Sequence, residues 1–230
     1  MSRDYILARI RVSLGIAGSG DPGRRAAARA RLATPLDHLR PARIDKPKPE
    51  LVRLFQDNMR QQSTDVMEAH GDGDVPALVA AYLQKHNVPQ RIRAGSDPRL
   101  AALPWERAPG LERLSGAADG ADEAALSMAL AGVAETGTLV LASGAENPTT
   151  LAFLPETHIV VIEEETIAGA FEEAIAILRT KFGRHEMPRS LNLVSAPSRT
   201  GDIGGKIVLG AHGPRRLGVI VIKTADRAAA

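Results

Sequence analysis

The chain has 230 residues, enough for one sizeable α/β domain or two small ones. It carries 29 Lys and Arg against 27 Asp and Glu, and this formal net charge of +2 gives no argument for nucleic-acid binding. Aromatic residues make up only 3% of the chain, too few to form a platform on which the bases of single-stranded nucleic acid would stack.

Cysteine is absent from the sequence. Its absence excludes disulfides, thiolate zinc sites, a cysteine nucleophile and cysteine-ligated iron–sulfur clusters within this chain. A flavin or nicotinamide cofactor is not excluded by the missing thiols, but no G-x-G-x-x-G motif supports one, and the histidines lack metal-like spacing. We expect no metal site and no cofactor in this chain. If the protein takes part in electron transfer, the redox centres belong to another subunit.

The N-terminal part of the chain is basic and shows little apolar patterning. Residues 4–14 predict a short helix, because their apolar residues fall near helical spacing. Residues 17–48 are rich in Gly, Pro, Ala and Arg, and we interpret them as a linker or a loosely attached arm. The arginines between residues 24 and 43 fit either an arm for an acidic partner or a solvated, flexible segment.

No apolar run approaches the roughly 20 residues that a membrane span needs, and the N-terminus lacks the continuous apolar core of a signal peptide. We therefore predict no membrane span and a cytoplasmic location. The predicted organisation is an N-terminal helix and flexible basic arm at 1–48, an α/β domain at 49–224 and a tail at 225–230.

Strands and helices are predicted to alternate from residue 49 onward. The expected elements are a helix starting near Pro49, a strand at 65–69, a helix at 75–86 and a strand at 90–93. The stretch 95–122 is predicted to be irregular, with its apolar side chains pinned to the core.

The second half of the chain shows the clearer pattern. Apolar runs of strand length occupy residues 125–133, 138–143, 158–164, 191–196 and 217–223, and the first of them also suits a helix. An amphipathic helix is expected at 167–183. This alternation predicts an α/β fold with a mainly parallel sheet flanked by helices, preceded by an N-terminal helical or flexible extension.

Three turns between these elements place polar residues at strand ends, where α/β proteins usually bind ligands. The first is 134–138, where Gly137 permits a positive φ and Thr136 and Thr138 add hydroxyls to a predicted ligand site. Glu135 is the candidate base, nucleophile or anchor for a substrate hydroxyl. The competing interpretation is a structural carboxylate that caps neighbouring amides.

The second turn covers residues 143–148. Asn147 or Thr149 is expected to cap a helix that starts there. His158 opens the next apolar strand, and both a hydrogen-bonded structural histidine and a general base stay open at this position.

The third turn runs from Ser195 to Arg215. Arg199 offers a planar fork for a carboxylate or phosphate, Asp202 is a candidate partner for it, and the loop is expected to receive an anion at a helix N-terminus. The predicted ligand-binding residues here are Ser198, Arg199, Thr200, Asp202, His212 and Gly213. A capped turn with a local salt bridge is the alternative.

Four segments together resemble the LUD-domain family and, within it, the lactate-utilisation C group. They are AETGTLVLASG, LPETHIVVIEE, APSRTGDI and VLGAHGPRRLGVIVI, in this order. The resemblance covers roughly residues 50–223, and its specific part is 125–223. It departs from the usual pattern where Gly204 replaces an acidic residue and Gly218 replaces a histidine.

The resemblance implies a fold like that of the NagB/RpiA/CoA-transferase group. It also implies an accessory, non-redox component of L-lactate oxidation to pyruvate, acting with two partner proteins, A and B, that carry iron–sulfur clusters. Glu135 is the catalytic candidate by analogy with that fold. Whether the chain is an enzyme by itself, and whether it forms a homo-oligomer, stays open.

Two other functions compete with this expectation. One is a stand-alone binder or transferase for a small carboxylate, phosphate or CoA-type ligand, based on the Glu135 turn and the 198–202 loop. The other is a folate cyclo-ligase-like enzyme of the same fold, although the Gly- and Tyr-rich C-terminal nucleotide motif of that group is missing here.

Overall fold

The computed structural model describes residues 2–15, 22–33, 41–183, 186–203 and 206–223. The chain divides into two compact units, Met1–Arg40 and Pro41–Ala230. The larger unit begins before the predicted boundary at residue 49, because Ile44 is fully buried in its core.

The described residues of the smaller unit form two helices, α1 (Arg3–Ser13) and α2 (Pro22–Ala33), and neither contains a buried residue. Helix α1 agrees with the predicted helix at 4–14. Helix α2 lies in the stretch 17–48, for which we predicted a linker or a loosely attached arm and no particular helix. Ala and Arg favour helix strongly and Pro22 suits the first helical position, so propensity forms α2 without an apolar stripe.

The larger unit is built around a six-stranded sheet, called the main sheet here, in which every strand pair is parallel. Its strand order is β1-β12-β7-β4-β2-β3. The strands are β1 (Asp65–Ala69), β2 (Arg91–Ala94), β3 (Glu112–Ser115), β4 (Ala124–Met128), β7 (Thr157–Glu163) and β12 (Arg216–Ile222). The predicted α/β fold with a mainly parallel sheet flanked by helices is confirmed.

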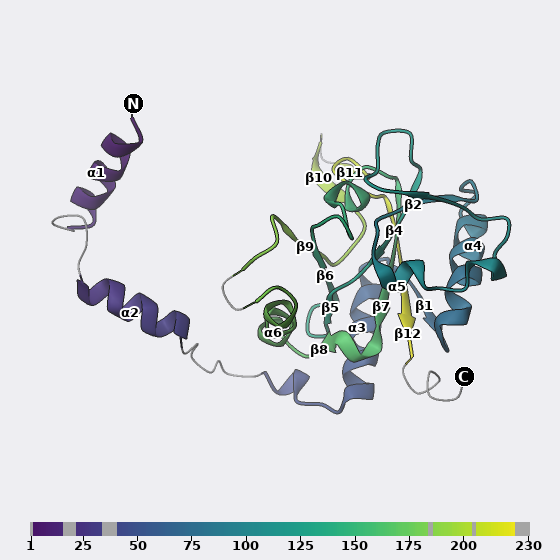
Figure 1. The fold of residues 1–230 in the computed structure, drawn as a ribbon, viewed down its shortest axis with the longest axis horizontal. Helices are drawn as coiled ribbons and strands as arrows, with labels where there is room; N and C mark the ends of the chain where they lie inside the picture. Colours follow the sequence, from purple (N-terminus) through teal and green to yellow (C-terminus); the bar gives the residue numbers. More distant parts are fainter. Residues whose placement is uncertain (1, 16–21, 34–40, 184–185, 204–205, 224–230) are drawn as a thin grey trace. The chain divides into compact units, whose positions relative to one another are not determined.

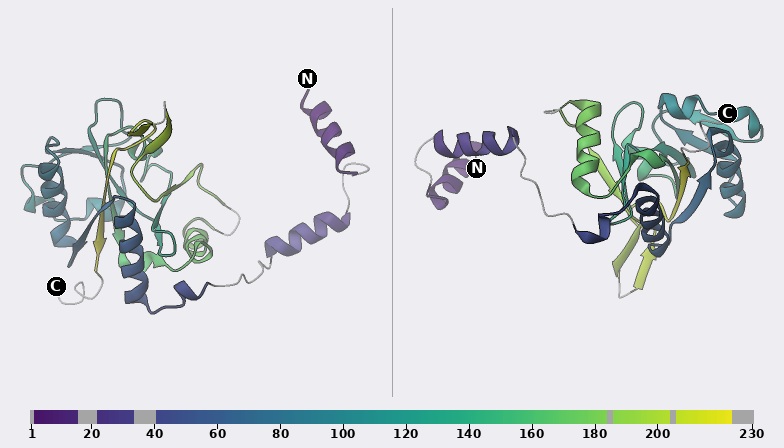
Figure 2. Two further views of the ribbon diagram at one scale, coloured as in Figure 1. Left: turned by 180° about the vertical axis from the view of Figure 1, so that it is seen from behind. Right: turned by 90° about the horizontal axis from the view of Figure 1, so that it is seen from below.

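Helices cover both faces of the main sheet, as Figures 1 and 2 show. Helix α4 (Val75–Lys85) packs on one face through Val79, Tyr82 and Leu83, and helix α3 (Lys48–Gln61) packs on the other through Phe55 and Met59. Because successive side chains of a strand point to opposite faces, both faces of β7 and β12 must be apolar. This explains why their sequences are continuous apolar runs.

Strands β5 (Ala131–Val133), β6 (Thr138–Ala142), β8 (Ile167–Ala168) and β9 (Leu191–Val194) form a separate small sheet in the order β8-β5-β6-β9. Strand β6 is antiparallel to both of its neighbours. The runs 138–143 and 191–196 were predicted to join one largely parallel sheet, which is wrong for these two strands. Helix α6 (Phe171–Phe182) packs against the small sheet through Ala174.

Shorter elements complete the larger unit. They are helix α5 (Pro98–Ala101), the antiparallel hairpin of β10 (Arg199–Ile203) and β11 (Lys206–Leu209), and the single-turn 3₁₀ helices η1 (Ala42–Ile44), η2 (Asp72–Asp74), η3 (Trp105–Arg107), η4 (Thr149–Ala152) and η5 (Glu164–Thr166). The stretch 95–122 is therefore less irregular than predicted. No helix within the described residues has the length and apolar character that crossing a membrane requires.

Gly218 lies in β12, the second strand of the main sheet, and faces the ring of Tyr82. A Cβ atom at this position would lie 2.9 Å from Tyr82 Cζ. The aromatic ring therefore occupies the space that a larger side chain at residue 218 would need. Gly204, the other departure from the family pattern, lies outside the described residues.

Candidate functional site

Strands β4 and β2 are neighbours in the main sheet, but the chain leaves them in opposite directions. The strand that follows β2 in sequence is β3, on its far side, whereas the next main-sheet strand after β4 is β7, on the other side. In open parallel sheets, a crevice forms at the carboxyl ends of two neighbouring strands whose connections run to opposite sides, and ligands bind there.

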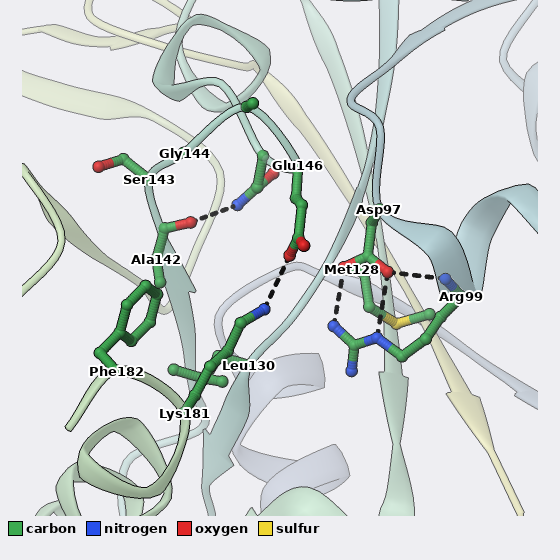
Figure 3. A pocket seen from close by; sticks show the side chains of 12 residues that line it. Asp97, Arg99, Met128, Leu130, Ala142, Ser143, Gly144, Glu146, Lys181 and Phe182 are labelled. Carbon is green, nitrogen blue, oxygen red and sulfur yellow. Dashed lines mark hydrogen bonds and ion pairs between the residues drawn. The ribbon is translucent and has the colours of Figure 1, made fainter.

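A pocket of about 300 Å³ lies at this point (Figure 3), and we call it the switch-point pocket. It is lined by Asp97 and Arg99 after β2, Met128 and Leu130 at the end of β4, the loop 142–147 after β6, and Lys181 and Phe182 of α6. Three separate parts of the fold, the main sheet, the small sheet and α6, therefore contribute to one cavity.

Asp97 and Arg99 form a rigid ion pair on one side of the pocket. The Asp97 carboxylate accepts hydrogen bonds from Arg99 Nε at 3.1 Å, from Arg99 Nη2 at 2.9 Å and from the Arg99 backbone N–H at 2.9 Å. Burial alone would raise the pKa of Asp97, but these hydrogen bonds outweigh it and hold the pKa below its usual value. Asp97 is thus a buried anion that fixes the Arg99 guanidinium in place.

Arg99 keeps donors available after this pairing. Its Nη1 has no hydrogen-bond partner among the described residues, and a third of its side chain is exposed. Burial alone would lower the pKa of Arg99, whereas Asp97 raises it, so the guanidinium stays charged. It can therefore present a fixed positive charge to a ligand.

Glu146 and Lys181 form the second ion pair of the pocket, at 2.9 Å, next to the first in Figure 3. Their side chains are 48% and 39% exposed, which is far more than the 4% of Asp97. Exposed pairs of this kind contribute little net stability, so this pair can exchange partners at low cost.

The loop that carries Glu146 is held against the end of β2. Ser96 donates its backbone N–H to the Ala145 carbonyl at 3.4 Å, and Asn147 Nδ2 donates to the Ala142 carbonyl at 3.3 Å. A Cβ atom on Gly95 would lie 2.0 Å from the Glu146 carbonyl oxygen. Glycine at residue 95 therefore permits the close approach that closes this side of the pocket.

A second pocket, of about 390 Å³, lies beside α3 at the carboxyl ends of β1 and β12. Lys48 Nζ donates to the carbonyls of Glu165 and Ile167 at 2.8 and 2.5 Å. Glu68 accepts from Gln56 at 2.8 Å and lies 3.5 Å from Lys223. These contacts tie α3 to the main sheet. We take the switch-point pocket as the candidate site because it lies where the connections from β2 and β4 part, the usual place for a ligand in such sheets.

The predicted catalytic residue, Glu135, does not line either of these pockets. Its carboxylate is paired with Arg43 and its side chain is only 16% exposed. Asn58 Nδ2 donates to its backbone carbonyl at 3.2 Å, and its N–H donates to the Gly169 carbonyl at 3.1 Å. These contacts favour the structural interpretation of this carboxylate.

The rest of the first turn lies beside the start of the third. Thr138 Oγ1 is 2.7 Å from both Thr136 Oγ1 and Ser195 Oγ, so the three hydroxyls form a chain. Gly137 has φ +62°, as a tight turn requires, and packs against Asn58. The structure brings these residues together, at a place separate from the switch-point pocket.

Ser198, His212 and Gly213 form another local group. The His212 N–H donates to Ser198 Oγ at 3.3 Å, and the Ser198 N–H donates to the Pro214 carbonyl at 2.7 Å. The contacts among the described side chains do not connect this group with Glu135.

The predicted anion site at a helix N-terminus is wrong for this segment. Arg199 and Thr200 lie in the hairpin, where Arg199 is exposed and opposite Leu209. The β-branched residues of this segment, such as Thr200 and Val208, favour strands over a helix. Asp202 lies in β10, but its side chain is outside those described.

His158 is fully buried in β7. Its Nε2 lies 2.9 Å from Ser127 Oγ, and burial lowers its pKa to about 4. It therefore stays neutral near pH 7, with its side chain buried away from solvent. The helix cap predicted at Asn147 or Thr149 is wrong, because η4 begins after Pro148 without a side-chain cap.

The sequence analysis missed Asp97, Arg99 and Lys181. Asp97 followed by Pro98 is a recognisable helix start, since aspartate caps and proline suits the first helical position. That signal predicts where Asp97 lies but not what faces it. In the part of the chain that the structure describes, no group of three or more His, Cys, Asp or Glu side chains could hold a metal ion.

Comparisons with known proteins give matches over most of the larger unit. A family model described as LUD domain matches residues 52–222. The chain is 29% identical over 176 residues to the Lactate utilization protein C of Macrococcus caseolyticus (strain JCSC5402), covering 75% of this chain and 71% of that protein. It is 26% identical over 168 residues to the protein of the same name from Geobacillus sp. (strain WCH70), covering 71% and 68%.

A solved structure shares the fold. The crystal structure of a DUF162 family protein from Deinococcus radiodurans matches with a TM-score of 0.58 at 23% sequence identity, covering 77% of this chain and 99% of that chain. At this level of identity the match concerns the fold alone.

Gly95→Ala should disturb the wall of the switch-point pocket. The new Cβ would lie 2.0 Å from the Glu146 carbonyl oxygen and 2.9 Å from Pro148 Cδ, so the loop has to move. We expect the free energy of unfolding to fall by about 1–3 kcal/mol in urea denaturation. Gly144→Ala, which meets nothing within 4 Å, is the matched control and should change it by less than about 0.5 kcal/mol. Equal effects of the two substitutions would contradict this packing.

His158 should make stability depend on pH. Because its pKa is about 4 in the folded chain against an ordinary 6.5, the unfolded chain binds a proton in this range that the folded chain excludes. The free energy of unfolding should therefore fall as the pH drops through this range, by about 2 kcal/mol from this group between pH 7 and pH 5. His158→Gln should remove that component of the slope, while His70→Gln should keep it. An unchanged slope in His158→Gln would refute the assignment.

Proposed function

Because the chain belongs to the LUD domain family, we propose that it takes part in the oxidation of L-lactate to pyruvate as a component without a redox centre, alongside separate iron–sulfur proteins. The observation that carries the proposal is the match of residues 52–222 together with relatives named Lactate utilization protein C.

The chemistry of the reaction supports a division of labour between subunits. Converting lactate to pyruvate removes two electrons and two protons, and iron–sulfur clusters carry such electrons one at a time. Clusters of this kind are held by cysteine thiolates, and this chain has no cysteine. Its own residues can bind and orient a substrate and exclude water from it, while the partner proteins A and B accept the electrons.

A reconstitution assay tests this proposal. Pyruvate formation from L-lactate is measured with the A and B partner proteins and an electron acceptor, with and without this chain. We expect the rate to fall to background when the chain is omitted and to return when it is added back. Equal rates with and without it would refute a direct role.

A second candidate function is a stand-alone binder or transferase of a small ligand, and the switch-point pocket specifically favours it. This function needs no partner protein. Calorimetry of the intact chain with lactate, an acyl-CoA and a sugar phosphate tests this stand-alone function without the partner proteins. A ligand that gives no binding heat is excluded.

A further inference from the structure

We propose that the smaller unit, Met1–Arg40, docks this chain onto an acidic surface with an apolar groove on an iron–sulfur partner protein, a choice of partner that rests on the proposed function. The candidate site uses none of the arginines of this unit. Three properties support the docking role: the excess of positive charge, the arrangement of the arginines on α2 and the exposed apolar side chains of α1.

The smaller unit holds a large excess of positive charge. Its sequence contains eight arginines, three aspartates and no lysine or glutamate, which gives a net charge of +5. Since the whole chain carries +2, residues 41–230 carry −3. Arginine binds a carboxylate with two parallel hydrogen bonds, whereas the lysine ammonium acts as a point charge. The unit is therefore suited to a surface rich in Asp and Glu side chains.

Helix α2 gathers its arginines on one side. With 3.6 residues per turn, Arg24, Arg25, Arg29 and Arg31 all lie on the same half of the helix surface. Leu32, which is 68% exposed, lies among them on that half. The helix contains no acidic residue, and Arg29 and Arg31 have no ion-pair partner in the described part of the chain. This face combines an apolar anchor with surrounding charges, as the centre and rim of a protein interface do.

Helix α1 exposes large apolar side chains on two sides. Ile6 and Ile10 are four residues apart and share one side, and Tyr5 and Val12 are seven residues apart and share another. All four side chains are 47–80% exposed. Helices of 11 and 12 residues are marginally stable in water without packing, and neither α1 nor α2 contains a buried residue. Docking onto a partner supplies contacts that stabilise both helices.

A protein groove fits this unit better than a lipid surface or a nucleic acid does. A helix that lies in a membrane surface keeps its apolar residues on one face, whereas α1 has them on two. A nucleic acid offers phosphates to the arginines but little apolar surface to the side chains of α1. A groove in a protein contacts two sides of a helix at once and presents carboxylates along its rim.

The proposed function identifies the partner. This chain has no cysteine, so electrons from lactate pass to clusters that other proteins hold, and those proteins have to meet this chain during the reaction. Opposite charges on the two surfaces steer that encounter and raise its rate. We expect the A or the B protein to carry clustered Asp and Glu side chains beside an apolar groove.

The arginines of α2 are tested by biolayer interferometry of the full chain against the purified A and B proteins. The double variant Arg29→Gln/Arg31→Gln should weaken the tighter of the two complexes by about tenfold or more, and added salt should weaken the unsubstituted complex. The matched control is Arg53→Gln/Arg189→Gln, which removes two exposed arginines from the larger unit. This control should leave the affinity unchanged.

The apolar side chains of α1 are tested in the same assay. Ile6→Ser/Ile10→Ser should also weaken the complex by about tenfold or more. Its control, Ile207→Ser/Leu209→Ser, removes two exposed apolar side chains from the hairpin of the larger unit and should have no effect. Because α1 and α2 contain no buried residue, the substitutions in them should leave the urea unfolding midpoint of the chain unchanged, which excludes misfolding as the cause.

Three results would overturn the docking role. They are no binding of the full chain to A or B, equal binding of either test variant and its control, or a loss in Arg29→Gln/Arg31→Gln that appears only with phosphatidylglycerol vesicles or duplex DNA in place of A and B. The last result would assign the unit to a lipid surface or to a nucleic acid.

The reconstitution assay separates this inference from the proposed function. A rate of pyruvate formation that depends on the chain, with full binding and full rate in Arg29→Gln/Arg31→Gln, would refute the docking role and leave the lactate role standing. Weaker binding of that variant to A or B, with a rate that never depends on the chain, would refute the lactate role and leave the docking surface standing.

Discussion

Strands β2 and β4 lie side by side and parallel, yet the chain continues from them toward opposite edges of the main sheet. The segments that leave these two strands therefore part, and a crevice opens at the carboxyl ends. Asp97 lies on the segment after β2, the loop 142–147 lies on the segment between β4 and β7, and Lys181 lies on α6. The location of the candidate site therefore follows from strand order, and its chemistry follows from which residues reach that point.

Within the site, the two ion pairs differ in burial and therefore in how easily they open. Asp97 is almost fully buried and bound three times by Arg99, so this pair acts as a fixed part of the scaffold. Glu146 and Lys181 are exposed and bound once, so they are free to exchange partners. Glu135 resembles Asp97 more than Glu146, because its largely buried carboxylate is already paired with Arg43. A carboxylate at a strand end is thus an insufficient sign of catalysis when its partners are unknown.

The sequence predicts the centre of the main sheet well because β7 and β12 are apolar runs buried on both faces, which leave an unambiguous pattern. The same pattern in β6 and β9 does not reveal that they pair antiparallel in a second sheet, since an apolar run carries no information about its partner. Helix α2 was missed because propensity alone forms it. None of the predicted site residues lines the switch-point pocket, although the turn at 143–148 was singled out, because Arg99 and Lys181 are 82 positions apart and only the tertiary fold places them at one pocket.

The most direct test of the switch-point site is a map of backbone amide chemical shifts during titration with L-lactate. We predict that the largest changes fall on Asp97, Arg99 and residues 143–147 and 181–182. Changes concentrated at 135–138 or at 198–213, with the switch-point residues unaffected, would contradict it and return the site to the turns that the sequence first suggested.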